Sequence, residues 1–217
     1  MTRTTIIFAL TFLYLFSACD KSTRQNGAKN SDQQIDTLKA IKIGDYWATP
    51  KPTFEYNMLL AYLGDTLSIV TCAEYVYSPF GRLNNKSEIK NSNLKNFNIS
   101  ERVDKIDFDE AVFQILTLEK SRLMLTFDND PEASKHSYIF EGEINDSNIN
   151  FIDDIKIGMS KEKFIKIFFD NFPNELMTKY KFIVFESCVQ DIKHTYTFKA
   201  DKLQSVNFKT DRWTQRK

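Results

Sequence analysis

Three polar side chains near the C-terminus come closest to a catalytic arrangement in this chain. Glu186, Asp191 and His194 lie within one predicted hairpin, but strand alternation directs Glu186 and its neighbour Phe185 to opposite faces. The hairpin turn keeps Asp191 near solvent. One hairpin supplies no nucleophile, no oxyanion donors and no enclosing pocket, so we predict a surface polar group here and not an acid/base pair.

Metal-binding and cofactor-binding patterns are also weak. The two histidines, His136 and His194, have no second histidine or cysteine at metal-ligand spacing. The acidic run 104–110 could attract Ca²⁺, but it lacks the turn glycine and spaced ligands of a calcium loop, so we expect a solvated surface. No Gly-x-Ser-x-Gly elbow, Walker loop or dinucleotide fingerprint occurs in the sequence. We therefore predict a protein that is not an enzyme and that uses no metal and no cofactor.

The N-terminal residues predict export and lipid attachment. The apolar run 6–16 is shorter than the roughly 20 residues that a membrane-spanning helix needs. Ser17-Ala18 then precedes Cys19, a pattern that resembles the lipobox of bacterial lipoproteins. This resemblance implies a signal peptide over 1–18 that is removed after a diacylglycerol thioether forms on Cys19. An ordinary secretory signal, cleaved near the same place, is the alternative.

We predict a flexible tether between the lipid anchor and the folded body. Residues 19–38 begin with the lipidated Cys19 and are almost wholly polar, so they offer little apolar surface to bury. Asp20 and Lys21 resemble the charged residues that sort some bacterial lipoproteins toward the outer membrane or the cell surface. The expected location is therefore the bacterial cell envelope, lipid-anchored, with the outer membrane or cell surface favoured over the inner membrane.

Composition indicates a β-rich body that does not bind nucleic acid. Lys plus Arg and Asp plus Glu both number 29, so no basic excess attracts phosphate backbones. The 19 Phe and 9 Tyr residues, against 6 Gly, favour strands and aromatic cores. The length allows two domains, which we place at 39–147 and 148–211, followed by a tail at 212–217.

Two cysteines accompany Cys19. Cys72 and Cys188 both lie in apolar runs that are typical of strands, far apart in the sequence and in different predicted domains. We predict that both are buried free thiols that pack as small apolar side chains. A disulfide between them, which an oxidising envelope would permit, is the alternative.

The first domain is predicted to consist mainly of strands. Residues 66–77 are rich in β-branched and aromatic side chains and end at a turn sequence. Residues 111–118 and 122–127 flank a short loop, as in an antiparallel hairpin, and 137–144 supply the next strand. The Asn-rich stretch 84–98 is expected to form an exposed loop.

One short motif suggests what the first domain could bind. Gly44-Asp45-Tyr46-Trp47, followed by these strands, resembles the opening of lipocalin-like small barrels. The resemblance implies an antiparallel meander or small barrel with an apolar cavity ringed by Trp47, Phe113 and Phe127. The alternative is that Trp47 is simply a core aromatic.

The second domain is predicted to be an amphipathic helix on a three-stranded sheet. Apolar residues recur at helical spacing over 162–172, Ser160 is a suitable N-cap, and Pro173 ends the helix. Three lysines are expected on the solvent side of this helix: Lys161, Lys163 and Lys166. Three strands are predicted to follow it: 181–189, 192–199 and 203–210.

The second domain also carries a family resemblance. The run Ile157-Gly158-Met159-Ser160-Lys161, the helix that ends at Pro173 and the meander containing 196–203 resemble the small envelope lipoproteins of the SmpA/OmlA type. These lipoproteins share their helix-plus-sheet architecture with the β-lactamase inhibitor protein. The resemblance implies an α+β fold class and a sheet face or loop that is presented to partners.

Three functional hypotheses follow from the sequence. The first is a non-enzymatic, membrane-anchored envelope lipoprotein that acts as a protein-binding or assembly accessory module, with an envelope protein as its partner. The second is a small apolar ligand binder that uses the lipocalin-like half. The third is an enzyme of an unfamiliar type, which the missing site chemistry makes the least favoured.

Overall fold

The computed structural model describes residues 41–43, 46–48, 54–71, 73–106, 109–127, 137–188 and 192–210. All of them belong to one compact unit, Asp36–Lys217. The predicted signal peptide, Cys19, the tether, the 212–217 tail, Cys72, His136 and Asp191 lie outside the described residues.

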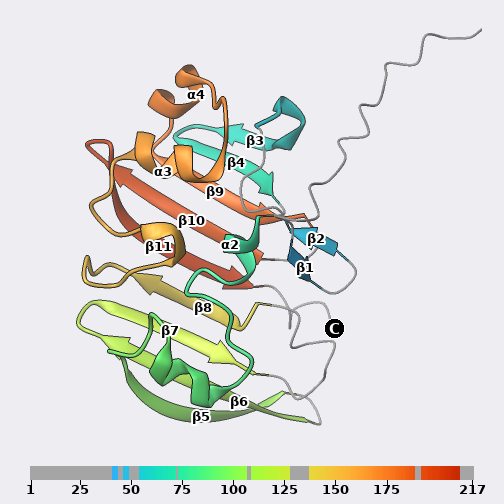
Figure 1. Ribbon diagram of the computed structural model, residues 1–217, viewed down its shortest axis with the longest axis vertical. Helices are drawn as coiled ribbons and strands as arrows, with labels where there is room; N and C mark the ends of the chain where they lie inside the picture. The colour runs from blue at the N-terminus through green and yellow to red at the C-terminus, as the bar shows by residue number, and fades with distance from the viewer. Residues whose placement is uncertain are drawn as a thin grey trace, which may run out of the picture. The chain divides into compact units, whose positions relative to one another are not determined.

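The described strands form two sheets (Figure 1). The short strands β1 (Ile41–Ile43) and β2 (Tyr46–Ala48) pair with each other. Nine strands make up the large sheet: β3 (Leu59–Leu63), β4 (Thr66–Thr71), β5 (Asn98–Ile106), β6 (Asp109–Leu118), β7 (Ser121–Thr126), β8 (Ile139–Ile144), β9 (Phe182–Ser187), β10 (Ile192–Lys199) and β11 (Lys202–Thr210). Their spatial order is β3-β4-β9-β10-β11-β8-β7-β6-β5, so β3 and β5 are the two edges among the described strands.

One parallel pairing joins the two halves of the chain. β4 runs parallel to β9, from Thr66 opposite Phe182 to Thr71 opposite Ser187, whereas all other neighbours in the large sheet are antiparallel. Strands from both predicted domains, 39–147 and 148–211, therefore lie in one continuous sheet. The protein is a mixed α/β molecule that is mostly β, so the α+β prediction is matched in part, and the large sheet is open among the described strands.

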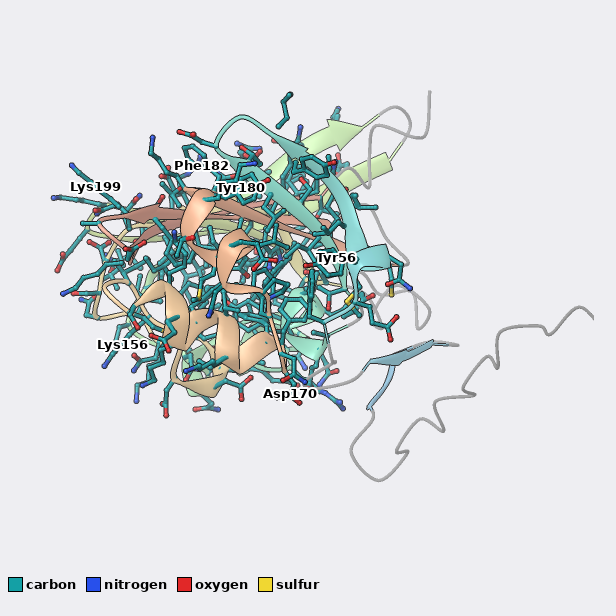
Figure 2. All side chains as sticks on the ribbon, turned by 90° about the horizontal axis from the view of Figure 1, so that it is seen from above. Tyr56, Lys156, Asp170, Tyr180, Phe182 and Lys199 are labelled. Atoms are coloured by element: carbon teal, nitrogen blue, oxygen red, sulfur yellow. The ribbon has the colours of Figure 1, made fainter. Side chains whose placement is uncertain are left out.

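The helical segments lie on one side of the sheet (Figures 1 and 2). They are short, and α3 is the longest of those described. The segments are η1 (Tyr56–Met58), α2 (Glu74–Tyr77), η2 (Lys86–Asn91), η4 (Ile152–Asp154), α3 (Lys161–Phe168) and α4 (Asn174–Lys179).

The main hydrophobic core lies between the sheet and these helices. Phe164 of α3 packs against Tyr196, with ring centroids 4.6 Å apart, and Phe168 packs against Phe185 at the same distance. Burying a side chain of this size stabilises the fold by about 1.5–3 kcal/mol. Every second residue of β10 faces this core: Ile192, His194, Tyr196 and Phe198.

Two predictions in the first half need correction. Residues 66–77 are not a single strand, because β4 ends at Thr71 and α2 turns the chain so that Tyr75, Val76 and Tyr77 are all buried. A strand could bury only alternate residues of that run against one core. The stretch 84–98 is not simply an exposed loop, since it contains η2 and buries three apolar side chains: Ile89, Leu94 and Phe97.

The second half follows the sequence prediction more closely. The Ser160 side chain caps α3 by accepting a hydrogen bond from the Lys163 backbone N–H at 3.3 Å, and the three predicted strands appear as β9, β10 and β11. The helix ends at Phe168, earlier than predicted, and Asn171 adopts a left-handed φ of 57°. The additional helix α4 then begins after Pro173.

The prediction that Lys161 faces solvent is wrong. Its side chain is buried, with 4% of the residue exposed, and its ammonium donates hydrogen bonds to the carbonyls of Met177 at 3.1 Å and Tyr180 at 2.9 Å. The ammonium also lies 3.1 Å from the Asp201 carboxylate and 5.5 Å from the centre of the Phe198 ring. At the first position of α3, Lys161 thus links the end of α4 to the turn between β10 and β11.

We expect Lys161→Met to lower the free energy of unfolding by about 2–3 kcal/mol, because it leaves buried carbonyls without a donor. Urea denaturation would measure the change. The matched control is Lys163→Met, on the exposed side of the same helix, which should change stability by less than about 0.5 kcal/mol. Equal effects of the two substitutions would contradict the linking role of Lys161.

Candidate functional site: an apolar sheet edge

The edge strand β3 has an unpaired side. Among the described strands its one neighbour is β4, so the backbone N–H and C=O groups on its outer side have no strand partner. Such a row of groups is a template for pairing with another chain. β3 follows η1 directly, and Tyr56 of η1 lies beside it (Figure 2).

Most side chains of this edge are apolar, and most are exposed. The sequence from Tyr56 to Gly64 contains no charged residue. Four of the exposed large apolar side chains in the described residues belong to it: Tyr56 (63%), Leu60 (52%), Tyr62 (67%) and Leu63 (83%). A cluster of this kind marks an interaction site more often than a singly exposed apolar residue does. We call η1 and β3 together the β3 edge.

The opposite edge of the sheet, β5, is protected by charge. Lys86 forms a salt bridge of 2.6 Å with Glu101, and Arg102 forms one of 2.7 Å with Asp104. Charged side chains along an edge strand disfavour pairing with another chain. The contrast between the two edges singles out β3.

A buried polar group lies in the aromatic core beneath α2. His194 Nδ1 lies 3.2 Å from the Tyr196 hydroxyl, the Tyr75 ring packs against both rings, and His194 Nε2 has no hydrogen-bond partner among the described residues. Burial lowers the pKa of His194 from 6.5 to about 3 and raises the pKa of both tyrosines. The imidazole is therefore neutral near pH 7, and the group has the character of a packed core.

The structure separates the residues of the predicted polar group. His194 is buried, so its placement on the surface is wrong, and it shares a sheet face with Phe185, which lies opposite it in the register. Glu186 points to the other face, as predicted, where it lies 3.2 Å from the Lys193 ammonium. Glu186 and His194 therefore do not form an acid/base pair.

Of the acidic run 104–110, residues 104–106 end β5 and residues 109–110 begin β6. Within the described part of the chain, no group of three or more His, Cys, Asp or Glu side chains is placed to hold a metal ion. Among the helices described, none has the length and apolar character needed to cross a bilayer.

Two of the three residues proposed to ring a lipocalin-like cavity, Phe113 and Phe127, are not brought together. The Trp47 side chain lies outside the described residues. Phe113 packs beside Phe140, with ring centroids 5.1 Å apart, on the sheet face without helices, whereas Phe127 stacks on Tyr138 at 6.1 Å at the margin of the main core. Phe113 and Phe127 therefore face opposite sides of the sheet.

A groove of about 790 Å³ lies between η2 and strands β5 and β6. Its lining includes Gln114, whose amide donates to Glu101 at 3.1 Å, and the two residues of the Lys86–Glu101 salt bridge. Neither Phe113 nor Phe127 lines this groove, so it is not the cavity that the second functional hypothesis places at those residues.

Cys188 does not match the prediction of a buried free thiol. It is exposed and disulfide-bonded. Its backbone N–H donates to the Thr71 carbonyl at 3.2 Å, directly after the parallel pair of Thr71 and Ser187. The register thus places Cys188 next to Thr71, the last residue of β4. Cys72 is the next residue after Thr71 in the sequence.

Sequence reasoning did not identify the β3 edge. Its strand is short, and its run of apolar residues shows neither strand alternation nor helical spacing. The signal that could have found it is the absence of charged residues between Glu55 and Asp65 in an otherwise charge-rich chain.

Comparison with protein-family models, with curated proteins and with solved structures finds no match for this chain.

Burial of His194 predicts a specific acid sensitivity. The unfolded chain protonates this side chain near pH 6.5, and the folded protein does so only near pH 3, so the free energy of unfolding falls as the pH drops through this window. The expected loss is about 1.4 kcal/mol per pH unit. His194→Leu should remove this contribution when urea denaturation is compared between pH 6 and pH 4, roughly the span between the two pKa values. Parallel stability profiles for the two proteins would contradict it.

We expect Cys72 to be the disulfide partner of Cys188, because the β4–β9 register leads to both residues. Peptide mapping without reduction should recover a peptide from each, joined together. Reduction should lower the free energy of unfolding by about 2–4 kcal/mol. Recovery of Cys188 joined to Cys19, or alkylated as a free thiol, would show that the expectation is wrong.

Proposed function

We propose that this protein is a lipid-anchored lipoprotein of the bacterial cell envelope that binds another protein through the β3 edge and catalyses no reaction. The observation that carries the binding role is the exposed, uncharged edge strand. The anchoring role rests on the lipobox-like residues that end at Cys19.

The β3 edge offers two kinds of binding energy. Each backbone hydrogen bond to an added strand contributes about 0.5–1.5 kcal/mol, and burial of each large apolar side chain contributes about 1.5–3 kcal/mol. Association must offset roughly 4–15 kcal/mol of lost freedom of motion. Several contacts of both kinds are therefore needed, and addition of a strand to β3 supplies them together.

The proposed anchor makes a modest affinity sufficient. Two or more acyl chains hold a protein stably at a membrane surface. A polar tether over 19–38 would let the folded body move near that surface, where partners in the same membrane have a high effective concentration.

We also propose that the unit of α3, β9, β10 and β11 corresponds to the SmpA/OmlA-like element. The features that support this are the Ser160 cap, the single helix packed on three antiparallel strands, and the loop around Gly158, whose N–H donates to the Leu203 carbonyl at 2.7 Å. In this proposal the β3–β4 hairpin is added to the SmpA/OmlA-like element through the parallel pairing of β4 with β9.

Photo-crosslinking in the source bacterium would test the proposed function. A photoreactive amino acid at Tyr62 should give a discrete protein adduct, whereas the same probe at Val103, an exposed position on the β5 edge, should give at least about fivefold less. Labelled fatty acid should appear on the wild-type protein but not on Cys19→Ala.

Two outcomes would overturn this proposal. An equal yield at Tyr62 and Val103, or no adduct at either position, would remove the binding role of the β3 edge. Acyl label that persists on Cys19→Ala would remove the anchor.

A further inference from the structure

We propose that the protein bound at the β3 edge is a second copy of this chain, and that two β3 strands pair antiparallel about a two-fold axis at Ala61. This inference rests on the proposed function, because it names the partner of the same edge. The result is a symmetric dimer in which two sheets join into one.

Self-pairing of β3 brings only uncharged side chains together, although the strand has one irregularity: the β3–β4 register shifts between Leu59 and Ala61, so Leu60 has no partner on β4. A two-fold axis at Ala61 places Leu60 opposite Tyr62 of the partner subunit, and Leu59, which lies beyond the register shift, near the partner's Leu63. Aliphatic–aromatic and aliphatic–aliphatic cross-strand pairs are stabilising, and no like charges meet. A surface that is complementary to itself closes as a two-fold dimer and does not grow into a fibre.

Antiparallel pairing of β5 with its own copy, about a two-fold axis at its central residue, is unfavourable. Its central residue is Arg102, so antiparallel self-pairing would place two guanidinium groups directly opposite each other. Like charges at that position destabilise a strand pair. When each edge strand pairs with its own copy about its central residue, β3 therefore suits a second copy and β5 does not.

The acidic side chains next to β3 have hydrogen-bond partners within each protomer, and Glu55 accepts from the Asn57 amide at 3.1 Å. The Asp65 carboxylate, in the turn after β3, accepts from the Lys181 ammonium at 2.6 Å. The Tyr56 hydroxyl donates to the Glu175 carboxylate at 3.1 Å. The Asp65–Lys181 ion pair limits charge repulsion at one end of the proposed interface.

The hairpin geometry sets which backbone groups face outward. Leu63 pairs with Thr66 across a two-residue turn, which makes them a hydrogen-bonded pair, so the groups of Tyr62 point away from β4. Tyr62 can then exchange hydrogen bonds with the partner's Leu60. The two copies of Ala61 form a non-hydrogen-bonded pair, with Cα atoms about 4.5 Å apart.

The proposed dimer has a functional consequence. A two-fold axis perpendicular to the joined sheets keeps the helices of both protomers on the same side. The faces without helices become continuous, and the dimer carries two lipid anchors. Simultaneous engagement of two anchors strengthens membrane attachment without any new contact.

Disulfide trapping tests the proposed register. In the full-length lipoprotein, Ala61→Cys should form an intermolecular disulfide under mild oxidation, because a Cα separation of about 4.5 Å falls within the range that disulfides span. Most of the protein should run as a dimer on a non-reducing gel. The matched control, Ser68→Cys, lies opposite Ala61 on β4, away from the free edge, and should give less than about a tenth of that yield.

A second variant tests the same interface without new cysteines. Tyr62 is mostly exposed, so Tyr62→Lys should leave the urea midpoint of unfolding essentially unchanged. It should nevertheless convert the dimer to a monomer in sedimentation equilibrium in detergent, because it places a charge in an apolar strand pair.

The outcomes separate this inference from the proposed function. An Ala61→Cys dimer yield no higher than that of Ser68→Cys, or a wild-type protein that sediments as a monomer, would overturn self-pairing. If the probe at Tyr62 then yields an adduct with a different protein, the β3 edge remains a binding site for that protein. If it yields no adduct, both proposals fail.

Discussion

The parallel pairing of β4 with β9 is the constraint on which the rest of the structure depends. It joins strands that are separated by more than half of the chain and places the C-terminal meander at the centre of the sheet. Because β9 occupies one side of β4 and β3 occupies the other, β3 becomes the terminal strand. The same pairing brings Cys188 to the end of β4, so the free edge and the disulfide that we expect with Cys72 would have a common origin.

The one-sided arrangement of helices explains the distribution of side chains. Strands in the centre of the sheet alternate buried and exposed residues, and their buried aromatic rings pack against α3 and α2. Two polar groups are drawn into this core. Lys161 is satisfied there by carbonyls at the end of α4, whereas His194 stays neutral and retains one unpaired nitrogen.

Local patterns predicted local structure well. The Ser160 cap, the hairpin of β6 and β7 and the three C-terminal strands all appear close to their predicted bounds, because capping, turns and alternation act over a few residues. The joining of both halves in one sheet could not be predicted, since a pairing between distant strands leaves no local signature. The burial of Lys161 depends on α4, a helix that the sequence pattern did not indicate.

The candidate site was hidden for a related reason. An edge strand is recognised only when the strand order is known, and the apolar run of β3 is equally compatible with a buried strand.

Hydrogen exchange at the amides of Leu60 and Tyr62 tests the central claim, that the outer side of β3 is open in the monomer and closed by association. We expect these two amides to exchange fast at high dilution and to be protected at high protein concentration, whereas exchange of the β5 amides should not depend on concentration. Exchange at β3 that is independent of concentration would contradict it.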